Sequence, residues 1–436
     1  MTHATHLRTS ASELAWEPVA DGVWRAVAPM RTRDGTMLVA DVYAGDAGRV
    51  RRPVLLERTP YGRRKARPSD AVLDGADPAS PEVVAARFVA RGFVVVRQDC
   101  RGRGDSEGRF TKYVDEAEDG YDSVAWAAAQ PWSDGRVATM GVSYSAHAQT
   151  ALAALHPEAL VAMFVDSGGF ASAYESGVRM GGAFELKQAT WALRRAAGDA
   201  RDGDSLARQA VADEPVEEWF RRLPWRRGHS PLRHVPAYED YFFDQWEHED
   251  FGPWWTQPAL YARGHAHRFP DVPSLHLCSW YDPYVRTAVE NFQTLSRLGE
   301  APVRLVLGPW THGRRSDTFA GDVDLGPEAA LEGSLAEDYV AMRADWFTAR
   351  LAGVPDSAPP VRWFLMGGGP GDVDAQGRLR HGGRWRTADT WPPGSTAPRQ
   401  FHLHPDGVLA EAPPAPGHSI SWDHDPADPV PTIGGR

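Results

Sequence analysis

Two serines lie in contexts that could supply a nucleophile. The run GDSEG at 104–108 has the spacing G-x-S-x-G. The run GVSYSA at 141–146 does not, because Ser145 stands where the spacing requires the second glycine. That spacing has catalytic meaning only where a strand ends, the chain turns sharply on the serine and a helix starts at once. An apolar run precedes Ser143 and an alanine-rich stretch follows it, whereas charged loop residues surround Ser106. The sequence therefore predicts Ser143 as the nucleophile.

A serine hydroxyl reacts only when a histidine takes its proton and a carboxylate orients that histidine. Where the nucleophile lies on such a strand-turn-helix motif, the acid and then the histidine come later in the chain, each in a loop after a strand. Asp282 almost directly follows the apolar run 275–280, and His312 follows the run 303–307 within GPWTHG. We predict that Ser143, Asp282 and His312 form a catalytic triad for acyl transfer.

Acyl transfer also needs donors for the negative oxygen of the tetrahedral intermediate. The backbone N–H of Tyr144, at the expected helix start, is one candidate. Tyr61, in a loop after an early strand, is the second. The alternative for Tyr61 is a turn residue packed against Pro60.

The remaining histidines and cysteines give no cofactor signal. His147 lies one turn into the helix expected after Ser143, where we expect it to pack against neighbouring side chains and not to react. Two H-x-H pairs, at 265–267 and 402–404, have no carboxylate or cysteine cluster near them, so neither a metal nor another cofactor is predicted. Cys100 and Cys278 each end an apolar run, which is typical of buried, unreactive thiols.

The elements that must position these residues alternate between strand and helix patterns. Strands are expected at 54–56, 93–98, 136–141, 160–165, 275–279 and 303–307, a turn at 131–135, and helices at 115–130, 144–155, 285–298 and 335–351. This alternation predicts an α/β fold of the α/β-hydrolase type with a mostly parallel sheet.

Two segments depart from that rhythm. Residues 168–268 carry helical stretches and six of the 17 tryptophans, which predicts a helical cap whose aromatic residues mainly fill its own core. Short strands at 361–366, 400–403 and 419–422 predict the beginning of an all-β module. The expected domains are a catalytic domain (18–167 and 269–355), the cap (168–268) and a partial β, jelly-roll domain (356–436).

Composition excludes several partner classes. The formal net charge is −11 without a long run of one sign, so neither a nucleic-acid footprint nor a polybasic membrane patch is present. The longest apolar run, 159–165, is far shorter than the roughly 20 residues of a membrane span. No secretory signal is visible at the N-terminus, so a cytoplasmic protein is expected.

Five stretches together resemble the cocaine-esterase-like and X-prolyl dipeptidyl-peptidase-like (CocE/NonD) serine hydrolases. They are RTPYG (58–62), GFVVVRQDCRGRGDSEG (92–108), DGYDSVAWAAAQPWSDGRVATMGVSY (119–144), WYDPYVRTAVENF (280–292) and GPWTHG (308–313). The resemblance implies Ser143, Asp282 and His312 as the triad, with Tyr61 and the Tyr144 amide at the oxyanion. It also implies a helical cap, a C-terminal jelly roll and a structural role for the RGRGDSEG loop.

The chain departs from that family in several places. Ala146 stands where the family usually has glycine, and Ser279 replaces the usual glycine before Trp280. The resemblance implies that relatives specialised for α-amino acid esters carry extra carboxylates just after the catalytic aspartate. Here 283–285 reads PYV, so recognition of a substrate amine is not expected.

Relatives continue well beyond the point where this chain ends, so a natural short form and a fragment both stay open. A half-built sheet leaves open edges and an uncovered apolar face, which predicts lower stability or a covering partner.

The leading functional hypothesis is hydrolysis of a small-molecule carboxylic ester through an acyl-enzyme on Ser143. Amide cleavage, by an acylase or an X-prolyl-type aminopeptidase, is the alternative because the same triad serves both. A third reading is a non-catalytic remnant that binds a ligand or partner. Assembly into a homo-oligomer stays open.

Overall fold

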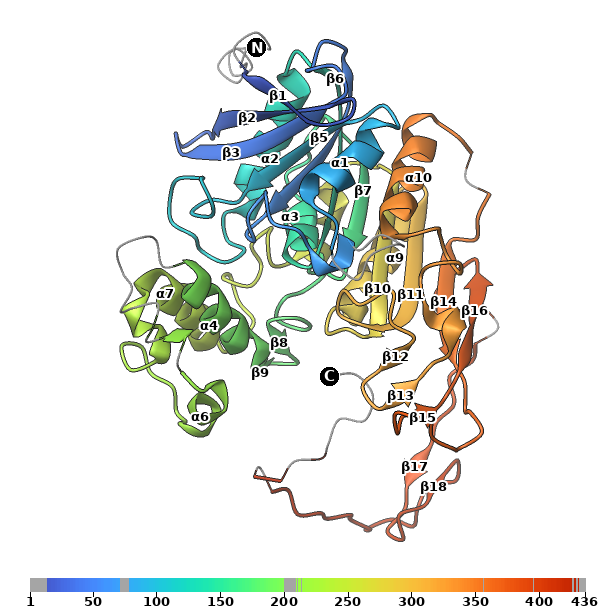
Figure 1. The fold of residues 1–436 in the computed structure, drawn as a ribbon. Helices are drawn as coiled ribbons and strands as arrows, with labels where there is room; N and C mark the ends of the chain where they lie inside the picture. The colour runs from blue at the N-terminus through green and yellow to red at the C-terminus, as the bar shows by residue number, and fades with distance from the viewer. Residues whose placement is uncertain are drawn as a thin grey trace.

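A single large sheet forms the centre of the molecule (Figure 1). The computed structural model describes residues 14–70, 78–199, 209, 211, 212, 214–355, 357–394, 396–425, 427, 428 and 430. In spatial order the sheet contains β1 (Trp16–Ala20), β2 (Val23–Arg31), β3 (Met37–Ala44), β5 (Val94–Asp99), β4 (Arg52–Thr59), β6 (Ser133–Val142), β7 (Leu160–Asp166), β10 (Ser274–Tyr281), β11 (Val303–Thr311), β14 (Val361–Met366) and β16 (Gly383–Ala388). In this spatial order, the neighbouring strands from β5 through β4, β6, β7, β10 and β11 to β14 run parallel to one another. The strands outside this group, β1, β2, β3 and β16, pair antiparallel with their neighbours. The predicted mostly parallel α/β sheet is confirmed.

Helices cover both faces of this sheet. They are α1 (Pro81–Val89), α2 (Glu116–Ala129), α3 (Tyr144–Ala153), α9 (Val285–Leu298) and α10 (Tyr339–Leu351). Successive strand residues point to opposite faces, so Val54 and Leu56 pack with α2 and α3, whereas Leu55 packs with α1 and α10. The carboxyl ends of the parallel strands are thereby left free between the two helical layers.

The segment between β7 and β10 is mostly helical and gathers beyond one end of the sheet (green in Figure 1). It contains β8 (Arg179–Met180), β9 (Ala183–Phe184), α4 (Lys187–Asp199), α6 (Val216–Arg221), α7 (Pro236–Glu247) and α8 (Ala262–His265), with 3₁₀ turns η4 (Pro231–His234) and η5 (Ala266–Arg268). Trp219 and Trp225 are buried and stack on each other at 4.5 Å between ring centres. Their rings pack on Phe242 of α7, so these tryptophans do fill a core of this segment.

The part of the chain after α10 differs from expectation. Strand β14 has the predicted bounds, yet it pairs parallel with β11, and β16 pairs antiparallel with β14. Strands β14 and β16 therefore extend the main sheet, whereas a separate β module was expected from residue 356. The division of the chain into three domains stays a prediction.

Smaller elements complete the fold. They are η3 (Pro68–Asp70), β12 (Phe319–Ala320), β13 (Val323–Asp324), η6 (Pro327–Ala329), β15 (Leu379–Arg380), β17 (His402–Leu403) and β18 (Leu409–Ala410). The strand predicted at 419–422 is wrong, because this exposed segment, with Trp422 80% exposed, has no neighbouring strand to pair with. The last, red part of the chain runs away from the body in Figure 1.

The bounds of three elements differ from the predicted ones. Residues 133–135, expected in a turn, begin β6, and β11 continues through Thr311. Helix α10 starts at Tyr339 instead of 335, because the Asp338 carboxylate caps it by accepting the Ala341 N–H at 2.8 Å. Within the described ranges, no helix has the length and apolar character needed to cross a bilayer.

Candidate active site

Ser143 lies on a sharp turn between β6 and α3. Its backbone has φ 60° and ψ −119°, a conformation that is strained for a residue with a side chain. The turn is crowded: a Cβ on Gly141 would lie 2.3 Å from that of Ser145, and one on Gly168 would lie 2.6 Å from the Ser143 carbonyl oxygen. The Ser143 N–H donates to the Asp166 carbonyl at 2.9 Å and ties the turn to the end of β7. The side chain is half-buried at the carboxyl edge of the sheet.

Asp282 and His312 meet at the ends of the adjacent strands β10 and β11. His312 Nδ1 lies 2.7 Å from Asp282 Oδ2, and the Tyr284 N–H donates to the other carboxylate oxygen at 2.9 Å. Burial raises the pKa of Asp282, but His312 and these hydrogen bonds outweigh it and hold the pKa below its usual value. The imidazole is therefore held by Nδ1, and its side chain remains 35% exposed.

Ser143 lies at the same edge of the sheet as His312. Within the described part of the chain, no hydrogen bond joins the Ser143 hydroxyl to His312. Packed rings connect the two regions: His312 to Tyr284 at 5.6 Å, and Tyr284 to His147 at 4.8 Å between ring centres. Since His147 lies one turn after Ser143 on α3, the three predicted triad residues border one region. Catalytic hydrogen bonds are often long before substrate binds.

Tyr144 and Tyr61 flank this region. Tyr144 is the first residue of α3, where backbone N–H groups lack partners within the helix. Its phenol points into the core, donating to Glu116 at 2.9 Å and accepting from the Tyr113 N–H at 3.0 Å. Tyr61 follows β4 and accepts a hydrogen bond from Trp191 Nε1 of α4 at 3.4 Å. The Tyr61 ring also packs edge-on against the Trp191 ring. The roles of the Tyr144 N–H and the Tyr61 hydroxyl as oxyanion donors stay a prediction.

Two arginines that the sequence analysis missed hold the Tyr61 loop. Arg63 donates to Asp41 at 2.8 Å and to Asp99 at 2.6 Å, and it pairs with Asp105 at 2.7 Å. Arg103 donates from Nε to the carbonyl of Pro60 at 2.7 Å. The signal lay in the motifs themselves, because RTPYG is followed directly by Arg63, and RGRGD contains Arg103 and Asp105.

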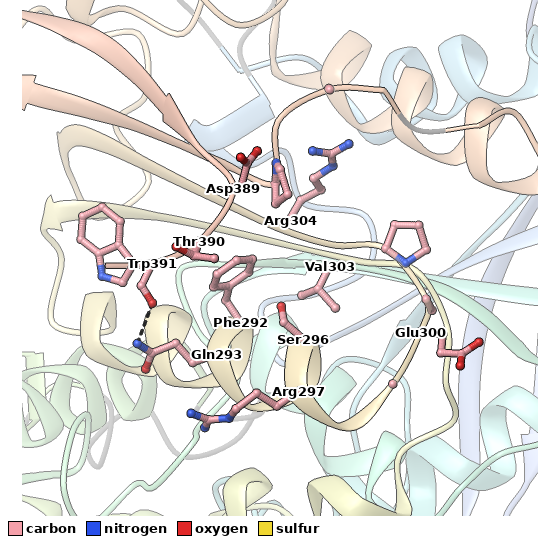
Figure 2. Close-up of a pocket in the computed structure, with 15 residues that line it drawn as sticks. Phe292, Gln293, Ser296, Arg297, Glu300, Val303, Arg304, Asp389, Thr390 and Trp391 are labelled. Carbon is pink, nitrogen blue, oxygen red and sulfur yellow. Dashed lines mark hydrogen bonds between the residues drawn. The ribbon is translucent and has the colours of Figure 1, made fainter. Parts of the chain in front are cut away.

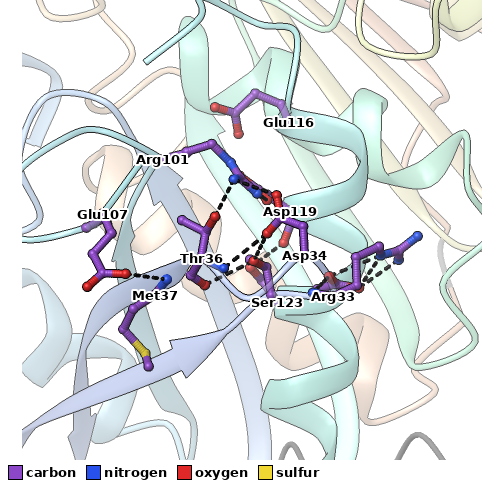
Figure 3. Close-up of polar contacts among 12 residues, drawn as sticks. Arg33, Asp34, Thr36, Met37, Arg101, Glu107, Glu116, Asp119 and Ser123 are labelled. Atoms are coloured by element: carbon purple, nitrogen blue, oxygen red, sulfur yellow. Dashed lines mark hydrogen bonds and ion pairs between the residues drawn. The ribbon is translucent and has the colours of Figure 1, made fainter. Parts of the chain in front are cut away.

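Polar contacts also hold the loop of the competing serine, and Figure 3 shows those of Arg101 and Glu107. Ser106 is buried, and its hydroxyl donates to the Asp99 carbonyl at 2.8 Å while accepting the Val39 N–H at 2.9 Å. Arg101 joins this loop to Thr36 at 2.6 Å and to Asp119 of α2. These contacts give Ser106 a structural role.

The other histidines and the cysteines are engaged elsewhere. His147 is fully buried, stacks on Phe170 at 3.6 Å and accepts the Gly169 N–H at 2.9 Å, so it packs as predicted. His265 and His404 each contact a backbone carbonyl. In the described ranges no group of three or more His, Cys, Asp or Glu side chains is placed to hold a metal. Both cysteines are buried, and burial raises the pKa of each thiol.

A wide hollow elsewhere on the molecule is unconnected with this region (Figure 2). It is lined by Phe292 and Gln293 of α9, by Arg304 of β11 and by Trp391, whose carbonyl accepts from Gln293 at 3.0 Å. Arg304 lies at the amino end of β11, whereas His312 follows its carboxyl end. The hollow therefore lies at the opposite edge of the sheet.

Comparisons with known proteins identify the family to which this chain is similar. The sequence profile of the family described as X-Pro dipeptidyl-peptidase (S15 family) matches residues 34–314. Cocaine esterase from Rhodococcus sp. (strain MB1 Bresler) is 29% identical over 432 residues, covering 92% of this chain and 68% of the esterase.

Two solved structures have similar folds. An alpha-amino acid ester hydrolase matches with a TM-score of 0.62 at 20% identity, over 95% of this chain and 68% of its own. A CocE/NonD family hydrolase from Staphylococcus aureus matches with a TM-score of 0.58 at 19% identity, over 93% of this chain and 65% of its own. The predicted α/β-hydrolase fold is confirmed.

Proposed function

The chain belongs to the X-Pro dipeptidyl-peptidase (S15) family of hydrolases, and on that premise we propose that it cleaves a carboxylic ester through an acyl-enzyme on Ser143. The observation that carries the proposal is the 2.7 Å contact between His312 Nδ1 and the buried Asp282 carboxylate. It lies at the sheet edge where the strained turn exposes Ser143. A serine on such a turn and an oriented histidine are the two parts that serine hydrolysis requires.

In the proposed reaction, His312 Nε2 takes the Ser143 proton as Oγ attacks the ester carbonyl. Asp282 stabilises the imidazolium that results, because its carboxylate is already held against Nδ1. The Tyr144 N–H and the Tyr61 hydroxyl donate to the oxygen of the tetrahedral intermediate. Tyr61 accepts from Trp191, which leaves the phenol proton free for this bond.

His312 then returns the proton to the departing alcohol, and the acyl group remains on Ser143. A water molecule, deprotonated by the same imidazole, attacks the acyl carbon. The bond to Ser143 Oγ then breaks, the acid is released, and His312 returns the proton to Oγ. Each step uses only groups that border the Ser143 region.

Ester cleavage is favoured over amide cleavage by the similarity to an esterase over most of the chain. Amide cleavage stays the second candidate, because the family description is that of a dipeptidyl-peptidase. An aminopeptidase must also bind the substrate's amino group. Residues 283–285, directly after Asp282, bring no carboxylate for that purpose.

Steady-state kinetics with aryl esters and matched anilides test the proposal. The wild-type protein is expected to hydrolyse the esters, and Ser143→Ala is expected to lower kcat by on the order of 10⁴ or more. Faster turnover of the anilides would favour the amide alternative. Near wild-type activity of Ser143→Ala would remove Ser143 from the mechanism.

A further inference from the structure

Three side chains of α4 form a stripe over the candidate site. Lys187, Trp191 and Arg195 follow one another at four-residue intervals, so they lie on one face of the helix. Lys187 Nζ is 4.6 Å from the ring centre of Tyr284, the neighbour of His312. Trp191 donates to the Tyr61 hydroxyl. The Arg195 guanidinium lies 4.5 Å from the Tyr61 ring centre.

Among the residues that the structure describes, neither cation of this stripe is hydrogen-bonded to a carboxylate. Among the described residues, Arg195 has no hydrogen bond and no ion pair, and its Nε is buried; its guanidinium lies over the rings of Tyr61 and Trp191. Lys187 Nζ is also buried without a hydrogen bond. Its ion-pair contact, to Glu185, is 3.8 Å long, which exceeds a hydrogen-bond distance. Both side chains are partly buried. Charge that is partly buried without a hydrogen-bonding partner is unfavourable, so these positions indicate a ligand.

Further positive charge surrounds the stripe. Lys112 Nζ lies 3.8 Å from the Trp191 ring centre and donates to Gln188 at 2.7 Å. Burial, followed by the charges of Lys187 and Arg195, lowers the pKa of the Lys112 ammonium. Burial and then Arg195 likewise lower the pKa of Arg103 to about 10. These cations are therefore close enough to repel one another.

The nearby carboxylates do not balance this charge. Asp282 is engaged with His312, and Glu116 is paired with Arg58 and accepts from Tyr144. Glu185, at 3.8 Å from Lys187, is the remaining acidic group facing the stripe among the described contacts. Counting the described side chains alone, positive charge is in excess between α4 and Tyr61.

From this arrangement we infer that the substrate carries a carboxylate on the part that lies under α4, where Arg195 and Lys187 bind it. The inference rests on the proposed function and names its substrate class. A guanidinium can hold a carboxylate through two parallel hydrogen bonds, and the ammonium adds a third donor. Tyr61, Trp191 and Tyr284 supply apolar surface for the uncharged part of such a molecule. A cationic substrate would be repelled.

Matched ester pairs test the inference and show which end of the substrate is charged. The acyl pair is the 4-nitrophenyl half-ester of glutarate and 4-nitrophenyl pentanoate, which differ by a carboxylate in place of a methyl group. The leaving-group pair is the acetate ester of 4-hydroxybenzoate and that of 4-methylphenol. In one of the two pairs, kcat/KM is expected to be about tenfold or more higher for the anionic ester, and the preference should fall as salt is added.

Variants assign that preference to the stripe. Arg195→Met and Lys187→Met are each expected to lower the ratio of kcat/KM for the anionic over the neutral ester by about tenfold. The matched control is Arg194→Met, because Arg194 is an exposed neighbour that lines a different hollow. It should leave the ratio unchanged.

Each outcome decides one claim. Hydrolysis of neutral esters without an anionic preference in either pair overturns the inference and leaves the proposed function standing. The same holds if the preference survives in both stripe variants. Failure to hydrolyse any of the four esters overturns the proposed function instead. If a variant does not fold, the wild-type preference and its salt dependence still decide.

Discussion

Arg315, three residues after His312, forms an ion pair with Asp166, whose own backbone carbonyl accepts the N–H of Ser143. Both side chains of the pair are buried, and Asp166 also accepts the Tyr339 hydroxyl at 2.5 Å. Burial tends to lower the pKa of Arg315, but Asp166 raises it above its usual value, so the guanidinium stays charged. This pair ties the loop that carries His312 to the turn that carries Ser143.

Breaking that pair is expected to affect both stability and catalysis. Arg315→Met leaves the Asp166 carboxylate buried with the Tyr339 hydroxyl alone, which should lower the free energy of unfolding by about 3–5 kcal/mol. Urea denaturation measures this change. Because Arg315 acts by positioning His312, kcat should also fall while KM changes little, and Arg315→Lys should restore part of kcat. Unchanged kcat in a folded Arg315→Met protein would assign the pair to stability alone.

Asp282→Asn is expected to lower kcat sharply, because the amide cannot stabilise an imidazolium and favours the wrong tautomer of His312. Losses on the order of 10⁴ accompany this type of change in serine hydrolases. Activity within about tenfold of wild type would show that another group orients His312.

The same variant should alter the dependence of stability on pH. The folded-state pKa of Asp282 is held below the unfolded value of about 3.9, so its ionised form stabilises the fold above that pH. This contribution is lost as the pH falls through the folded-state pKa. Thermal melts from pH 6 down to pH 3 should therefore show a shallower decrease in Tm for Asp282→Asn than for wild type. Parallel curves would contradict the pKa shift.

Tyr61→Phe separates an oxyanion donor from a packing residue. The ring and its contact with Trp191 are retained, whereas the hydroxyl proton is lost. If Tyr61 donates to the intermediate, kcat should fall by about 10²–10³ with little change in KM. A variant with wild-type kcat would leave Tyr61 with packing alone.

Ser106→Ala is the counterpart for the competing serine. Removing its hydroxyl leaves the Val39 N–H without its partner, so the free energy of unfolding should fall by about 1–3 kcal/mol. Turnover by the folded variant should stay near wild type. Loss of turnover without loss of stability would point to Ser106 in the reaction.

Much of the fold could be predicted because its signals are local. The run at 285–298 became α9 and the run at 361–366 became β14, each with the predicted bounds, since apolar periodicity sets both. The sheet membership of β14 could not be predicted, because it depends on pairing with β11. The strand expected at 419–422 did not form for the same kind of reason: a strand needs a neighbour.

The candidate site, like the fold, could be predicted only in part. The order Ser143, Asp282, His312 and the strands before them were readable from the sequence, and Asp282 and His312 do meet; their catalytic roles stay a prediction. The Asp166–Arg315 pair and the α4 stripe over Tyr61 were missed. Both join segments remote in sequence, and no local pattern marks a cation that lacks a partner.

Peptide mapping after reaction with a fluorophosphonate tests the central claim most directly, because the reagent bonds covalently to a serine that an oriented histidine activates. The account predicts one adduct per chain, located on Ser143, and its loss in both Ser143→Ala and His312→Ala. An adduct on Ser106 or another residue, or no adduct on the folded protein, would contradict it.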